Sequence, residues 1–113
     1  MQAGLNIHRW ELISMATYTP DRWIVVELTH KGEKIRKVFA GWYGGYCGSD
    51  SWKLSSETIK TIDHGEYYEF QQHSGSVYIC YKGAEGVSMY MESIFCNWAD
   101  QNNAETYIEK VNV

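Results

Sequence analysis

The stretch RWIVVELTHKGEKIRKVFAGW at residues 22–42 decides the fold of this chain. Apolar residues alternate along 22–30 and again along 34–42, with the period of two that sends neighbouring side chains to opposite faces of a sheet. The turn at 31–33 contains a glycine, which adopts the positive φ of a tight hairpin turn. We therefore predict an antiparallel hairpin. Its first strand should be central, because the run Trp23 to Val26 makes both of its faces apolar.

The same alternation recurs outside this hairpin, interrupted by turn residues about every eight to twelve positions. It predicts further strands at Trp10–Thr17, Ser51–Ser55, Thr58–Asp63, Glu66–Gln72, Ser76–Lys82 and Thr106–Val111. The last of these is expected to lie at a sheet edge. A strand-rich domain follows.

The period changes once, where Met91, Ile94, Phe95 and Trp98 repeat at helical spacing. This stripe predicts one amphipathic helix over 88–101 with Ser88 as its N-cap. The fold class is therefore α+β and mainly antiparallel β. We expect a strongly bent sheet or partly open barrel of about 6–8 strands, with one helix near the C-terminus.

Length and charge limit the functions open to the chain. Its 113 residues predict a single domain over 1–113, and its longest apolar run is too short to span a bilayer. The formal net charge of −4 argues against nucleic-acid binding, which needs a basic face to displace counterions from phosphates. We expect neither nucleic acid nor membrane as a partner.

Cysteine usage indicates a reducing compartment. Three cysteines without CxxC spacing do not form a disulfide framework, and 1–10 do not form the apolar stretch of a signal peptide. We predict a cytoplasmic protein. Cys80 and Cys96 fall at positions that are expected to face the core, while Cys47 lies in a glycine-rich loop.

Four basic residues gather on the predicted hairpin, with one acidic residue among them: Lys31, Lys34, Arg36 and Lys37, with Glu33. A solvated turn whose lysines protect an exposed strand edge explains this cluster. A docking patch for an acidic partner is the alternative.

The segment from Trp42 to Trp52 carries four aromatic rings among glycines, and these are our candidate ligand-binding residues: Trp42, Tyr43, Tyr46 and Trp52. Flat rings with polar handles bind aromatic, sugar or cationic ligands by stacking and cation–π contact. The alternative is that the two tryptophans fill the core while the tyrosines cap its rim. The glycines match no phosphate-binding motif.

Evidence for catalysis or a cofactor is weak in the sequence. The histidines and cysteines have no metal-ligand spacing, so we predict no metal site, no cofactor and no catalytic residues. Cys47, on a glycine-rich loop, is the one candidate nucleophile expected to be exposed, and an ordinary loop thiol is the favoured explanation of it. Carboxylate pairs such as Glu66 with Glu69, or Asp50 with Glu57, occur in any acidic protein of this size.

Three segments, SWKLSS at 51–56, YYEF at 67–70 and SGSVYIC at 74–80, resemble small uncharacterised proteins carried by phages and integron gene cassettes. The resemblance implies a mobile-element accessory protein, often a compact oligomer that binds a ligand or a partner. It contains no catalytic motif and assigns no residue a role.

The favoured hypothesis is a non-enzymatic binding protein with an aromatic, glycine-rich pocket and a self-associating surface. One alternative is a protein-interaction module, an inhibitor or adaptor that acts on a host protein. The other is a small hydrolase, which would need convergent polar groups with perturbed pKa values in one cleft.

We predict that the chain forms a homodimer or a higher oligomer. Five Trp, nine Tyr and three Phe are more aromatic surface than one small core holds, and a second copy would cover the remainder. The expected contact residues are Met91, Phe95 and Trp98, with Tyr43 and Tyr46 nearby. Sedimentation equilibrium at tens of micromolar should therefore give a mass above the 13.1 kDa of the monomer. A monomer at that concentration would contradict this.

Overall fold

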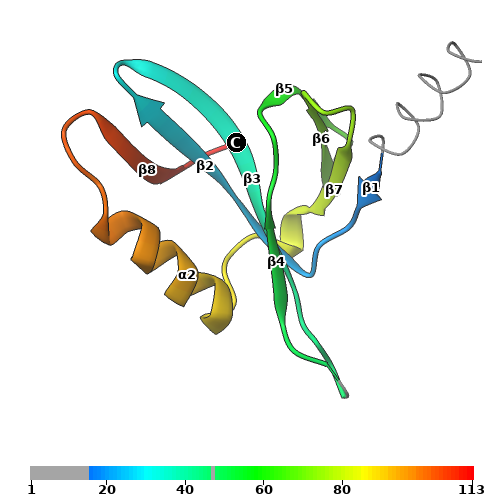
Figure 1. The fold of residues 1–113 in the computed structure, drawn as a ribbon. Helices are drawn as coiled ribbons and strands as arrows, with labels where there is room; N and C mark the ends of the chain where they lie inside the picture. Colours follow the sequence, from blue (N-terminus) through cyan, green and yellow to red (C-terminus); the bar gives the residue numbers. More distant parts are fainter. Residues whose placement is uncertain (1–15, 47) are drawn as a thin grey trace, which may run out of the picture.

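The computed structural model describes residues 16–46 and 48–113 (Figure 1). Its strands are β1 (Thr17–Tyr18), β2 (Arg22–His30), β3 (Glu33–Trp42), β4 (Ser51–Leu54), β5 (Thr58–Asp63), β6 (Tyr67–Gln72), β7 (Val77–Tyr81) and β8 (Thr106–Val111). A 3₁₀ turn, η1 (Lys82–Ala84), precedes the helix α2 (Met89–Asp100). The predicted α+β class with a helix near the C-terminus is confirmed. Of the strand predicted at Trp10–Thr17, all but the end lies outside the described residues.

The described strands form two sheets, ordered β1-β7-β6-β5 and β4-β3-β2-β8. All pairings are antiparallel except that of β1 with β7. The sheets do not close into a barrel. β2 lies between β3 and β8, and β8 is an edge strand, as the sequence predicted.

The turn between β2 and β3 has the predicted chemistry. His30 pairs with Glu33, which leaves a loop of Lys31 and Gly32. Both have positive φ, 49° and 85°, as a two-residue primed turn requires. This turn sets the register of the whole hairpin, including the pairs Leu28 with Ile35 and Val26 with Lys37.

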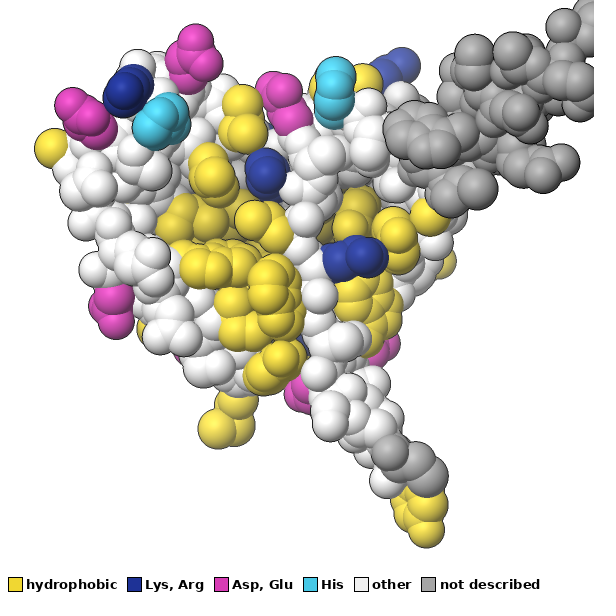
Figure 2. Space-filling view, viewed as in Figure 1, with side chains coloured by type: hydrophobic (Ala, Val, Ile, Leu, Met, Phe, Trp, Pro, Cys, Tyr) yellow, Lys and Arg dark blue, Asp and Glu magenta, His cyan; other side chains and the backbone are white. Residues whose placement is uncertain are grey.

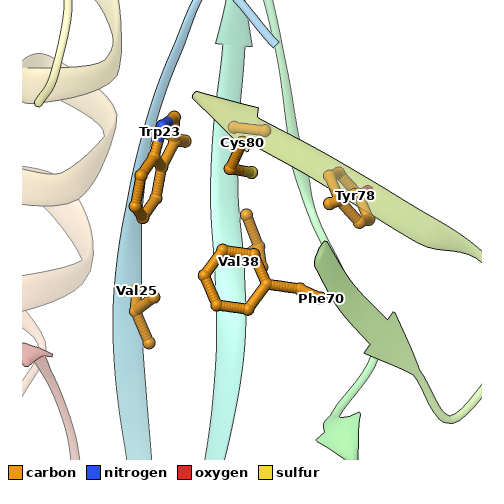
Figure 3. Packing of buried hydrophobic residues seen from close by; sticks show 7 residues of the cluster. Trp23, Val25, Val38, Phe70, Tyr78 and Cys80 are labelled. Carbon is orange, nitrogen blue, oxygen red and sulfur yellow. The ribbon is translucent and has the colours of Figure 1, made fainter. Parts of the chain in front are cut away.

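The two faces of β2 belong to two different cores. Trp23 and Val25 pack with Val38 and Ala40 of β3 against β6 and β7 of the other sheet (Figure 3). Ile24 and Val26 lie on the opposite face in a second buried cluster whose other members are Phe39, Met91 and Ile108. A strand that is apolar on both faces is thereby covered on both.

Trp23 connects the sheets most closely. Its side chain is fully buried, and its ring lies 5.6 Å from that of Phe70 and 6.0 Å from that of Tyr68. The indole Nε1 donates a 2.7 Å hydrogen bond to the carbonyl of Tyr81, at the end of β7. The polar atom of this buried ring is therefore satisfied.

A buried polar corner joins the sheets where β4 leads into β5. Ser55 Oγ accepts a 2.8 Å hydrogen bond from Val38 N–H and lies 3.0 Å from Oε1 of Gln72. Thr58 Oγ1 donates to the same Gln72 oxygen at 2.9 Å. The almost fully buried Gln72 is thus held by both sheets.

A side-chain cap fixes the start of α2, and a side chain just past its end connects the helix to β8. Ser88 Oγ accepts from Met91 N–H at 3.2 Å, which confirms the predicted N-cap. Past the C-terminus, Asn102 Oδ1 accepts from the N–H of Ile108 at 2.9 Å, and its Nδ2 donates to the carbonyl of that residue at 3.0 Å. The helix exit is therefore tied directly to β8.

One sequence prediction about the core is wrong. Cys80 is fully buried as expected, whereas Cys96 is exposed. The stripe that faces the sheet contains Met91, Ile94, Phe95 and Trp98, and position 96 falls outside it.

Gly41→Ala should destabilise the protein by about 1 to 3 kcal/mol, the usual cost of overpacking a buried contact. A Cβ there would overlap Sδ of Met91 and lie 2.8 Å from its Cγ. Gly83→Ala is the control, because its Cβ would meet nothing within 4 Å. Urea denaturation measures both variants. Equal midpoints would mean that α2 does not press on β3 at this point.

Candidate functional site

An open groove lies beside α2 on the outer face of the sheet β4-β3-β2-β8. Twelve residues make a helix of about 18 Å, whereas the nine residues of β2 extend about 30 Å. One helix therefore cannot cover the face. The uncovered part is a groove of about 340 Å³ lined by Leu28, Leu54, Trp98, Gln101, Asn102, Thr106, Tyr107 and Ile108. Figure 2 shows apolar side chains forming a continuous patch over this region.

Strand register assembles the apolar floor of the groove. Leu28 of β2 is paired with Ile108 of β8, and Phe39 of β3 with Leu54 of β4. Paired residues share a face, so side chains from four strands meet on one surface. Leu28 and Leu54 are half-buried, which leaves part of this floor open to solvent.

Trp98, which lines the groove, belongs to a group of three aromatic rings. The ring of Trp98 lies 4.8 Å from that of Phe39 and 5.3 Å from that of Trp52. The planes of Trp52 and Trp98 meet at 74°, so the two indoles make a corner. Phe39 is fully buried beneath them, whereas Trp52 is 38% exposed. This cluster of three aromatic rings therefore extends from the buried core to the protein surface.

Polar side chains also border the groove. The amide of Asn102 is occupied by Ile108, as described above, and Thr106 Oγ1 lies 2.6 Å from Nδ1 of His30. The Gln101 side chain is exposed and lines the groove. Its amide can donate and accept hydrogen bonds at the rim.

The four predicted ligand-binding residues do not lie together. Trp42 packs against the core between the sheets, and its Nε1 donates to the carbonyl of Thr19 at 3.1 Å. Tyr43 and Tyr46 are exposed on the β3–β4 loop, which projects from the body of the molecule (Figure 1). Trp52 alone lies beside the groove, because it is on the opposite face from Trp42.

The predicted interface residues divide between core and groove. Met91 is fully buried beneath α2, while Phe95 and Trp98 are half-buried against the same cluster. The structure thus joins Trp52, predicted to bind ligand, with Trp98, predicted to lie at an interface.

Sequence reasoning missed the rest of the lining, above all Leu28, Leu54 and Thr106. Alternation places Trp52 and Leu54 on one face of β4, and this signal was present. The pairing of β4 with β3 was not, because strand order is a tertiary property.

The candidate catalytic groups are occupied or remote. His64 and Gln71 each hydrogen-bond Glu69 at 2.8 Å, and these bonds lower the pKa of its carboxyl. Asp50 accepts from Gly44 N–H at 2.9 Å. Burial raises the pKa of the Cys80 thiol and, with the nearby Glu92, that of Cys96. Cys47 lies outside the described residues.

Comparison with protein-family models, curated proteins and solved structures returns no match for this chain. In the described ranges, no group of histidine, cysteine and carboxylate side chains could hold a metal ion. No helix of that same part of the chain has the length and apolar character to cross a membrane.

The reactivity of the thiols tests two features of the structure, the exposure of Cys96 on α2 and the burial of Cys80 on β7. In a Cys47→Ser background, Ellman's reagent at pH 8 should modify one thiol of the native protein, that of Cys96, more slowly than free cysteine because the pKa is raised. Cys80 should react only in denaturant. Two thiols that react together in the native protein would contradict the buried position of Cys80.

Proposed function

We propose that this chain is a non-enzymatic binding protein whose groove beside α2 takes a flat, largely apolar small molecule. The carrying observation is the aliphatic floor of the groove next to Trp98, whose ring meets that of the partly exposed Trp52 at 74°. A planar ring that stacks on one indole would meet the other by its edge, a favourable arrangement for aromatic pairs.

Size and composition support a small ligand. A volume of about 340 Å³ is at the lower end of the range for ligand pockets and suits one or two fused rings. Apolar side chains provide most of the lining, and amide and hydroxyl groups border it, the usual composition of a ligand site.

The lining also favours binding over hydrolysis. None of the eight described residues that line the groove is a carboxylate, histidine or cysteine. The nearest histidine on this face, His30, is engaged by Thr106. A hydrolase would need an acid–base pair or an activated nucleophile at such a site.

Self-association remains part of the proposal and is supported by exposed aromatic surface. Tyr43 and Tyr46 are 55% and 102% exposed, on a loop available to a second copy. Free thiols at Cys80 and Cys96 support a cytoplasmic location. The mobile-element origin implied by the resemblance stays a prediction.

The uncharged dye phenylnaphthylamine, a naphthalene joined through nitrogen to a phenyl ring, provides a test, because its fluorescence rises in apolar surroundings. Titration of protein into a fixed dye concentration should give a dissociation constant on the order of 10 to 100 µM, from the usual free energy per ligand atom. Thr106→Trp should weaken binding roughly tenfold, since the new ring would fill the groove from its rim.

Glu109→Trp is the matched control, because Glu109 is exposed on the same strand and on its other face. It should leave the affinity unchanged. Equal loss in both variants, or no binding by the wild type, would refute the small-ligand proposal. In the second case a protein partner would become the better explanation of the patch.

A further inference from the structure

Lys37 is a cation on the apolar face that carries the groove. It alternates with Ile35 and Phe39 along β3 and is paired with Val26 of β2, so it shares their face. Its place in the register is diagonal to Leu28 and to Leu54, which line the groove from either side.

The other basic residues of the hairpin have different surroundings. Lys34 and Arg36 lie on the opposite face, where Glu27 pairs with both, at 3.8 Å and 3.4 Å. Lys31 is exposed in the turn. Lys37 is half-buried, and no carboxylate among the described residues forms an ion pair with it.

We infer that the ligand of the groove is a flat aromatic anion, with a carboxylate or similar group that pairs with Lys37. This inference rests on the proposed function and adds the charge of the ligand. Lys37 is half-buried among apolar side chains and has no ion pair within the described residues, so its ammonium group is held at this face, where an anionic group can pair with it. The rings would occupy the indole corner while the anionic group reaches towards β3.

Protection of a strand edge is the competing explanation of Lys37. β4 pairs only with Phe39–Trp42, so no strand in the described part of the chain pairs with Glu33–Lys37 on that side. A lysine on such a segment discourages pairing with another chain. Removal of the Lys37 charge distinguishes the two explanations. It should weaken anion binding under the first and promote pairing with another chain under the second.

Two dyes with the same rings separate charge from shape. Anilinonaphthalene sulfonate carries an anionic group that phenylnaphthylamine lacks. Lys37→Met keeps an unbranched apolar stem, and it should raise the dissociation constant of the sulfonate about threefold to tenfold while changing that of the neutral dye less than twofold. Lys34→Met, from the paired and opposite face, should change neither. Added salt should weaken only the sulfonate.

Each result has a definite meaning. Absence of neutral-dye binding by the wild type would refute the proposed function itself. Binding of both dyes with no effect of Lys37→Met on either would leave the groove as a binding site and overturn the charge assignment. Equal weakening of both dyes would also overturn it, since the lysine would then act through shape. A larger oligomer for Lys37→Met than for the wild type in sedimentation velocity, with unchanged dye binding, would establish edge protection instead.

Discussion

The burial of β2 on both faces is the constraint on which the rest of the structure depends. The run from Trp23 to Val26 is apolar at every position, so a layer on one side of the strand would leave alternate side chains in water. Two different layers cover the strand. The second sheet packs against Trp23 and Val25, and the helix packs against Ile24 and Val26. Each fully buried side chain of this kind contributes about 1.5 to 3 kcal/mol.

The groove follows from the difference between these layers. A sheet can cover a sheet, because both are several strands wide, whereas one helix of about 10 Å diameter covers only part of four strands spaced about 4.8 Å apart. The face next to α2 therefore keeps half-buried Leu28, Leu54 and Trp98, with Trp52 at the margin. Two hydrogen bonds from the Asn102 side chain to Ile108 connect the end of α2 to β8, and both residues line the groove.

Alternation along β3 also places its basic residues on two different faces of the sheet. The hairpin contains a cluster of basic residues in the sequence, but the surroundings of these residues differ between the two faces. Glu27 forms ion pairs with Lys34 and Arg36 on one face, and Lys37 lies on the other, among apolar neighbours. The basic cluster of the hairpin is thus divided in two. Lys34 and Arg36 belong to a solvated ion-pair network, whereas Lys37 has no ion pair among the described residues and lies next to the candidate ligand site.

Local patterns in the sequence determined the elements, because they depend on neighbours within a few residues. The periods of two and 3.6, the glycine at Gly32 and the cap at Ser88 predict the strands and the helix closely, including the bounds of β2, β5 and β8. Other features needed the tertiary structure. The sequence could not place Trp42 and Trp52 on opposite faces of one sheet, turn Cys96 to solvent, or bring Leu54 to Phe39. These depend on strand order and on which side of the sheet the helix lies, and both are decided by contacts between residues far apart in the chain.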